Sequence, residues 1–117
     1  MIKRVNFSKK DEVNSVSATP LQKSGAEPLT LTGAAIVERP DENGEVREVG
    51  LLATTAGTYS CISATAIKGL DGIIDYMTEL EGDNELEGDN ELGEGIQVRV
   101  VKNKSNAGRE FLTLQIL

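Results

Sequence analysis

Residues 29–63 read LTLTGAAIVERPDENGEVREVGLLATTAGTYSCIS, and they predict three successive strands. The first strand covers residues 29–39 and contains Gly33, and a glycine inside a strand favours a bulge or bend. The turn signal PDENGE follows, with an Asn-Gly pair that is typical of hairpins. Residues 46–55 then return as the second strand. After a further glycine, residues 58–63 are rich in β-forming side chains and predict the third strand.

The next segment, residues 63–80, changes from a strand period to a helix period. Its apolar residues recur at steps of three and four, which places them on one side of a helix. They are Ile67, Leu70, Ile73, Ile74, Met77 and Leu80. Ser63 or Thr65 can cap the start, because a hydroxyl there accepts from the free backbone N–H groups of the first turn. The segment is therefore predicted to form one amphipathic helix.

Two more strands follow the helix. Residues 95–102 alternate apolar and polar side chains, and residues 109–117 do the same after the turn NKSNAG. The full order is strand, strand, strand, helix, strand, strand. This order predicts an all-β domain with one helix over residues 29–117, an OB-fold-like five-stranded barrel. A five-stranded sheet with one packed helix is the rival architecture.

The N-terminal segment, residues 1–28, is rich in Ser, Ala, Thr, Pro and Gly in its second half. That composition is typical of a flexible arm, with room for one short strand around residues 2–7. It has no apolar core of a secretory signal, and no run approaches the roughly 20 apolar residues of a membrane span. The one cysteine, Cys61, has no partner for an internal disulfide. Together these features predict a cytoplasmic protein.

The negative charge of the chain comes from one segment. The formal net charge is −7. Residues 79–95, which contain the unit ELEGDN twice, hold eight carboxylates and no Lys or Arg. The rest of the chain keeps 11 acidic side chains, that is 19 minus 8, against 12 basic ones. Outside residues 79–95 the net charge is therefore about +1 by the same side-chain count.

The acidic segment 79–95 is interpreted as a solvated loop inserted into the domain. A calcium loop needs oxygen ligands at alternate positions, a central Gly and a final Glu. Asp83, Glu85, Asp89 and Glu91 do not have that spacing. Carboxylates that repel one another keep such a loop extended. An alternative hypothesis is that the loop competes with nucleic acid for a basic groove of the same protein.

The sequence offers no set of residues for catalysis. His is absent, which removes the commonest general base and metal ligand. Ser60, Cys61 and Ser63 lie close together, but no base is paired with any of them. In an apolar strand Cys61 is interpreted as a small core residue. We therefore expect no enzyme activity, no metal site and no cofactor.

The last hairpin carries most of the candidate binding residues. Its basic side chains are Arg99, Lys102, Lys104 and Arg109. By alternation, Arg99 lies away from the apolar face of its strand, and Phe111 lies away from the leucine face of the next strand. Proteins that bind single strands use cations along the phosphates and flat rings under the bases. Tyr59 is a second candidate ring. The alternatives are that both rings fill the aliphatic core and that the cations are ordinary hairpin surface.

Two stretches of the chain carry a resemblance to a known family. They are TYSCISATAIKGLDGIIDY (residues 58–76) and IQVRVVKNKSNAGREFLTLQI (residues 96–116). Both resemble single-stranded DNA-binding proteins of small phages and mobile elements of Gram-positive bacteria, above all of phages with protein-primed linear genomes. The resemblance implies an OB-fold that coats single strands in replication or transfer without sequence preference. In some relatives an N-terminal extension supports oligomers, which implies a homo-oligomer through residues 1–28.

The first function hypothesis is a sequence-independent single-stranded DNA-binding protein of a phage or mobile element, with no membrane partner. In this hypothesis phosphates meet Arg47, Arg99, Lys102, Lys104 and Arg109, and bases stack on Tyr59 and Phe111. The alternative hypothesis is an acidic protein-binding module that occupies the nucleic-acid site of a host or defence enzyme. A structural or assembly domain without a ligand is the third.

Overall fold

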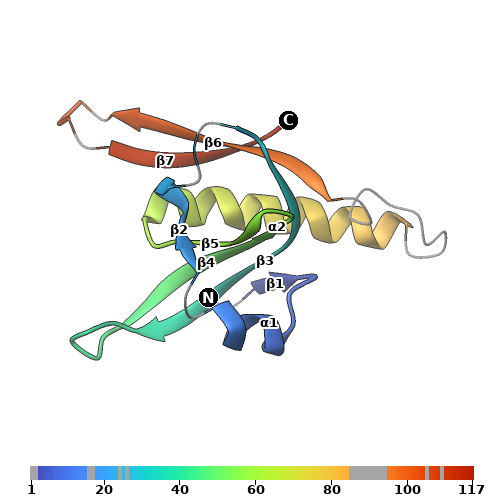
Figure 1. Cartoon of the computed structure of the whole chain (residues 1–117), viewed down its shortest axis with the longest axis horizontal. Helices are drawn as coiled ribbons and strands as arrows, with labels where there is room; N and C mark the ends of the chain where they lie inside the picture. The colour runs from blue at the N-terminus through green and yellow to red at the C-terminus, as the bar shows by residue number, and fades with distance from the viewer. Residues whose placement is uncertain are drawn as a thin grey trace.

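A computed structural model describes residues 3–15, 18–23, 25, 27–84, 95–104, 106–108 and 110–117. The described residues are mostly β, with few helices (Figure 1). The elements in chain order are β1 (Lys3–Val5), α1 (Lys9–Asn14), β2 (Thr19–Pro20), the 3-10 turn η2 (Leu21–Lys23), β3 (Leu29–Pro40), β4 (Val46–Thr54), β5 (Gly57–Cys61), α2 (Ala64–Asn84), β6 (Ile96–Lys104) and β7 (Glu110–Ile116).

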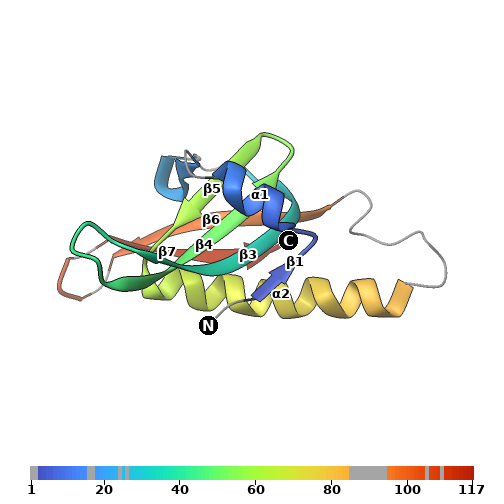
Figure 2. The same cartoon turned by 90° about the horizontal axis from the view of Figure 1, so that it is seen from below.

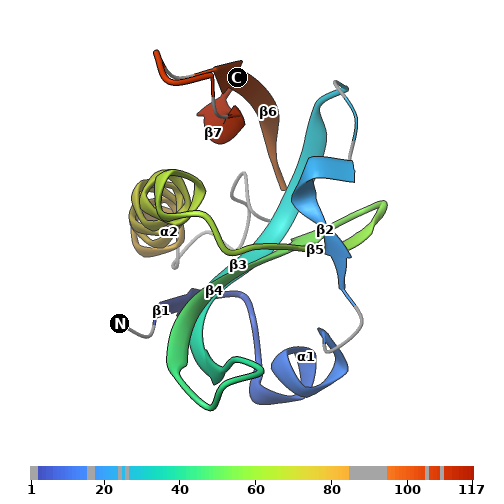
Figure 3. The ribbon, with the colours of Figure 1, turned by 90° about the vertical axis from the view of Figure 1, so that its left-hand side faces the viewer.

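The strands form one mixed sheet that curls around α2 (Figure 3). Its strand order is β2-β5-β4-β3-β6-β7. Strand β1 also pairs with β3 but is not part of this linear order. The β2–β5 pair is parallel, and the other pairs are antiparallel. The sequence predicted a five-stranded barrel. The described sheet is a half-barrel of seven strands, because the segment before β3 adds β1 and β2 to it.

Strand β3 joins the two halves of the curled sheet. Its first three residues pair with β6, while Leu31 and the residues from Gly33 onward pair with β4. The register shifts between Leu31 and Gly33, which confirms the bulge predicted at that glycine. A Cβ at position 33 would stand 2.3 Å from the carbonyl oxygen of Asn6. Glycine therefore lets the chain after β1 cross β3 at the point where the sheet bends.

Helix α2 lies in the hollow of the sheet and supplies much of the core. The side chain of Ser63 caps it, accepting from the backbone N–H of Ala66 at 3.2 Å, as the sequence predicted. The predicted apolar stripe is buried at Ile67, Leu70, Ile73, Ile74 and Met77. It packs against aliphatic side chains of β3, β4 and β6. The core is thus built with few aromatic rings, as the composition indicated.

The helix continues into the segment that was predicted to be an acidic loop. It ends at Asn84, so residues 79–84 are helical and not loop. The apolar residue at position 80 continues the helical period of the residues before it, which is consistent with a helix that extends past that position. Residues 85–94, which contain the rest of the predicted loop, lie outside the described residues.

The N-terminal segment packs against the sheet, whereas the sequence predicted a flexible arm. Val5 and Leu21 are buried in the same core as α2. Phe7 is buried in a second cluster with Val37 and Leu51, on the other face of the sheet. Helix α1 covers that face, opposite α2 (Figure 2). A few apolar residues among many polar ones were enough to anchor the segment, and its average composition did not reveal them.

Polar contacts fix the N-terminal segment as well. The ammonium of Lys3 lies 2.5 Å from a carboxylate oxygen of Asp71 and 2.8 Å from one of Asp75, which ties β1 to α2. These contacts raise the pKa of Lys3, with Asp71 as the main cause. The guanidinium of Arg39 donates to the carbonyl oxygen of Glu12 and to Ser15 Oγ, which ties the end of α1 to β3. Among the described helices, none has the length and apolar content to cross a bilayer.

Candidate nucleic-acid interface

The β6–β7 hairpin presents two different faces. Val98, Val100 and Leu114 are on its inner face and pack in the core. Arg99 is opposite Gln115 and Phe111 is opposite Asn103 in the register, so both lie on the outer face. This is the arrangement that alternation predicted for Arg99 and Phe111. Position 103 is four steps along β6 from position 99, so the two sites are about 13 Å apart along the strand.

The lysines of the hairpin belong to its inner face. Lys102 is opposite Leu112 and Lys104 is opposite Glu110 in the register. The buried part of β6 ends at Val100, and both lysines are exposed beyond it, toward the free end of the hairpin. The structure thus divides the predicted cations between two faces. Arg109, the remaining predicted cation of this hairpin, lies outside the described residues.

The exposed cations of the hairpin differ from Arg47 in their partners. In the described part of the chain, no carboxylate forms an ion pair with Arg99, Lys102 or Lys104. Arg47, at the start of β4, lies 2.6 Å from a carboxylate oxygen of Asp41 and 3.4 Å from one of Glu45. The Arg47 guanidinium is the main cause that lowers the pKa of Asp41. Arg47 is therefore already neutralised in part.

The two long hairpins have opposite charge. Residues 96–111, around the β6–β7 turn, hold four basic and one acidic side chain, a net of +3. Residues 38–48, around the β3–β4 turn, hold two basic and five acidic side chains, a net of −3. Both hairpin ends point to the same end of the molecule (Figure 1). An anionic ligand at that end is attracted to the β6–β7 hairpin and repelled by the other.

The two predicted rings have different surroundings. Tyr59 on β5 is opposite Leu52 in the register and packs, half-buried, against the core around α2. Phe111 is half-buried on the outer face of β7. Tyr59 therefore has the core contact that one of the alternatives predicted, while it keeps part of its surface in solvent. The two rings come from different strands and lie on different faces of the sheet.

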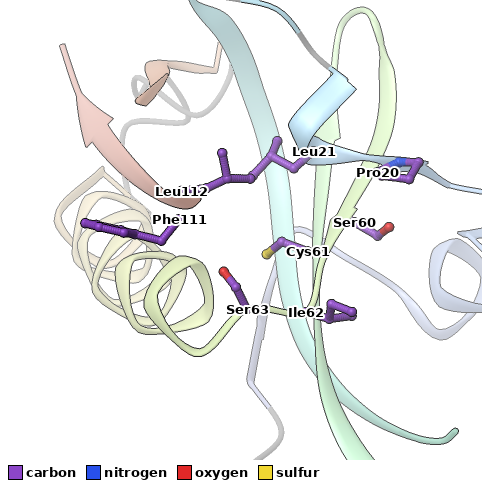
Figure 4. Close-up of a pocket in the computed structure, with 8 residues that line it drawn as sticks. All are labelled: Pro20, Leu21, Ser60, Cys61, Ile62, Ser63, Phe111 and Leu112. Carbon is purple, nitrogen blue, oxygen red and sulfur yellow. The ribbon is translucent and has the colours of Figure 1, made fainter. Parts of the chain in front are cut away.

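A pocket of about 290 Å³ lies between the two ends of the curled sheet, and we call it the β5–β7 pocket (Figure 4). Its lining residues are Pro20, Leu21, Ser60, Cys61, Ile62, Ser63, Phe111 and Leu112. Leu21 and Leu112 point toward each other across it. No local sequence pattern indicates this pocket, because η2, the end of β5 and the start of β7 are brought together only by the fold.

Cys61 is a buried residue of this pocket. Its side chain packs in the core, and burial raises the pKa of the thiol to about 11. The thiol is thus protonated at neutral pH, which disfavours a nucleophilic role. The geometry here offers cations, a ring and a small pocket, which together can bind an anionic ligand that carries flat groups.

Comparison with known families adds one finding. A family model described as phage single-stranded DNA-binding protein matches residues 30–117 of the chain. The match covers β3 to β7, and so includes the β6–β7 hairpin and Tyr59. No curated protein and no solved structure matches the chain.

Proposed function

The chain belongs to the family of phage single-stranded DNA-binding proteins. From this premise we propose that it coats single-stranded DNA without sequence preference, during replication or transfer of a phage or mobile element in the cytoplasm of its bacterial host. The role needs no catalysis, cofactor or membrane. The observation that carries the proposal is the β6–β7 hairpin, whose exposed cations form no ion pair among the described residues and which also carries Phe111.

The proposed contacts follow from the charges and the rings. The residues that meet phosphates are Arg99, Lys102, Lys104 and Arg109, with Arg47 in a weaker role. Arg47 contributes less because DNA has to replace Asp41 and Glu45 as its partners. The rings that stack on bases are Phe111 and the exposed part of Tyr59. These contacts read no base edge, which is why sequence preference is not expected.

The proposal extends to the fold type and to assembly. We interpret the curled half-barrel as an OB-like barrel, a fold whose curved sheet binds single strands in many proteins.

Self-association through residues 1–28 is also proposed. Val13 on α1 is 61% exposed and supplies an apolar contact for a second copy. Sedimentation of the chain beside a Val13→Asp variant tests this, because a dimer that uses α1 is expected to dissociate in the variant.

The experiment that tests the proposed function is a titration of labelled oligo-dT, followed by fluorescence anisotropy over a series of salt concentrations. We expect binding that weakens steadily with salt, because each phosphate contact releases a counterion. A Phe111→Ala, Arg99→Ala double variant is expected to bind more weakly. Flat anisotropy at low salt, or unchanged affinity in the double variant, would contradict the proposal.

The second candidate is a protein-binding module that imitates nucleic acid. The acidic β3–β4 end and the acidic segment 79–95 favour it. Deletion of residues 81–92 separates the two candidates. A DNA-binding protein is expected to keep or gain affinity for oligo-dT, because repulsion is removed. A nucleic-acid mimic is expected to lose its partner, which a pull-down with the full and the deleted chain detects.

A further inference from the structure

The β5–β7 pocket lies where the curled sheet does not close. One wall comes from β2, η2 and the end of β5, and the other comes from Phe111 and Leu112 on β7. Strands β2 and β7 stand at the two ends of the strand order, and no backbone ladder joins them. The volume of about 290 Å³ is at the lower limit of small-ligand sites. The pocket is thus sized for one small ring system.

The walls are mostly apolar, and two serines, Ser60 and Ser63, are among the lining residues. Leu21 is 1% exposed and Cys61 is 6% exposed, so both are fixed by the core. The hydroxyl of Ser63 points toward the middle of the pocket (Figure 4). Ser63 Oγ accepts from the backbone N–H of Ala66, and among the described residues no acceptor is bound by its own O–H, which can therefore donate to a ligand. Apolar walls with a hydroxyl donor suit a flat ring with an acceptor atom on its edge, which every nucleobase has, so this hydroxyl does not select one base.

A lysine lies opposite one of the lining residues of the pocket. Lys102 is opposite Leu112 in the antiparallel register, so the Cβ atoms of the two residues are about 5 Å apart on the same face. Lys102 is exposed and has no ion pair among the described residues. Its ammonium can therefore reach an anion that is attached to a group in the pocket. Phe111, the residue before Leu112, belongs to the same wall, and its ring points away from the other labelled lining residues (Figure 4).

We propose that the β5–β7 pocket takes one base of the bound single strand, while Lys102 holds the adjacent phosphate and Phe111 stacks on a neighbouring base. The proposal rests on the proposed function, because it names a subsite for the same DNA. A nucleotide fits better than an apolar side chain of a protein partner, because such a side chain leaves the Ser63 hydroxyl and the Lys102 charge unused. The base enters through the gap between β5 and β7.

A variant that fills the pocket provides the first test. Leu112→Phe enlarges a side chain that points into the pocket, and Ile116→Phe makes the same change on the same face of β7, outside the pocket. We expect Leu112→Phe to weaken oligo-dT binding by about tenfold or more, because the variant loses a base contact. The slope of log affinity against log salt is expected to stay the same, because the variant keeps its phosphate contacts. Ile116→Phe is expected to bind like the natural chain. Equal affinity of the two variants for oligo-dT would overturn the proposal.

Cys61 gives a second test, which uses the natural chain and needs no variant. At pH 9 roughly one thiol in a hundred is ionised, given the pKa of about 11, and slow alkylation can be followed by mass spectrometry. Saturating oligo-dT is expected to slow alkylation of Cys61 at least severalfold. An abasic oligomer of the same length, at a low salt concentration where it is bound, is expected not to protect the thiol.

The outcomes separate the pocket from the function. Unchanged alkylation in the presence of bound oligo-dT overturns the pocket and leaves DNA binding intact. Protection by the abasic oligomer to the same extent also overturns it, because the backbone then covers the thiol without a base. Absence of any oligo-dT binding at low salt overturns both the pocket and the proposed function.

Discussion

At the scale of single residues, glycines decide how closely the elements approach. Gly50 on β4 is opposite Cys61, and a Cβ there would lie 2.6 Å from Cys61 Sγ and 2.8 Å from Leu70 Cδ2. A Cβ added at Gly72 on α2 would meet no neighbouring atom within 4 Å. The sequence shows both as glycines inside regular elements, and nothing local distinguishes them. The difference arises because Gly50 lies where α2 packs on β4, whereas Gly72 lies on the side of α2 that faces solvent.

Gly50→Ala is expected to lower the free energy of unfolding by about 1–3 kcal/mol, because the added methyl overpacks the contact between β4, β5 and α2. Gly72→Ala is the matched control, and it is expected to raise stability by up to about 1 kcal/mol, because alanine favours the helix. Urea denaturation of both variants measures the change. Equal effects of the two substitutions would show that α2 does not approach β4 at Gly50.

Partners also decide how much each cation contributes to DNA binding. Lys102→Gln is expected to reduce the slope of log affinity against log salt by about 0.7, the value for one phosphate contact on a single strand. Arg47→Gln is expected to change it less, because Asp41 and Glu45 already occupy Arg47. The salt series on oligo-dT measures both. A larger change for Arg47→Gln would place the DNA on the β3–β4 hairpin instead.

At the scale of elements, the N-terminal segment behaves as part of the domain. It adds a strand at each of two places in the sheet and buries side chains on both faces. The capping box of α1 joins Ser8 and Asp11, whose side chains each accept from the other residue's backbone N–H. These are local signals that the sequence contains. Their effect depends on β3 and β4, which present a face for the segment to cover.

Leu21→Ala is expected to cost about 2–5 kcal/mol of stability, because Leu21 is 1% exposed in the main core and its truncation leaves a cavity. Val13→Ala, on the exposed side of α1, is expected to change stability by less than about 0.5 kcal/mol. Thermal or urea unfolding compares the two. A Leu21→Ala variant as stable as the natural chain would mean that residues 1–28 are a flexible arm after all.

Acid is expected to loosen α1 before the rest of the domain. Hydrogen bonds from Ser8, first from its backbone N–H, lower the pKa of Asp11, and Lys9 and then Arg4 lower that of Glu12. A carboxyl whose pKa is lowered by folding stabilises the folded state at a pH above its ordinary pKa, which is 3.8 for Asp11 and 4.5 for Glu12. This stabilisation is lost as the pH falls through the lower pKa of the folded state. Amide exchange measured from pH 6 down to pH 3 detects it. In an Asp11→Asn variant the loss is expected to be smaller, since one titrating group is gone.

At the scale of the whole molecule, charge is distributed unevenly. The chain has a net charge of −7, yet its β6–β7 hairpin is positive and its acidic residues gather around the β3–β4 turn and in residues 79–95. A protein with a net negative charge can bind DNA when its positive and negative side chains lie in separate regions. At 0.1 M salt, charges more than about 10 Å away are largely screened, so the DNA responds mainly to the nearby positive side chains. The acidic parts then limit how and where DNA approaches.

Neutralising the carboxylates of residues 85–94 tests this division of charge. Replacing the five Glu and Asp side chains by Gln and Asn changes the net charge from −7 to −2. We expect oligo-dT binding to persist and to tighten at low salt, with a smaller gain at high salt, because repulsion is screened. Titrations at two salt concentrations measure it. Loss of DNA binding would instead give the acidic residues a direct role in the site.

The sequence by itself determined much of the domain from Leu29 onward. Its strands and helix begin and end within a few residues of their predicted positions, because each depends on a local period of apolar side chains, a cap or a turn. The bulge at Gly33, the Ser63 cap, the buried stripe of α2 and the outward position of Arg99 and Phe111 were predicted in the same way. The resemblance to phage single-stranded DNA-binding proteins was also read from sequence, and the family match confirms it.

Only the tertiary structure decided which residues meet across the fold. It brought Leu21 next to Leu112 and created the β5–β7 pocket, it engaged Arg47 with carboxylates, and it packed residues 3–23 onto the sheet. These features depend on contacts between residues tens of positions apart. Local periodicity carries no information about them, because the burial of a side chain depends on which surface the folded chain places against it.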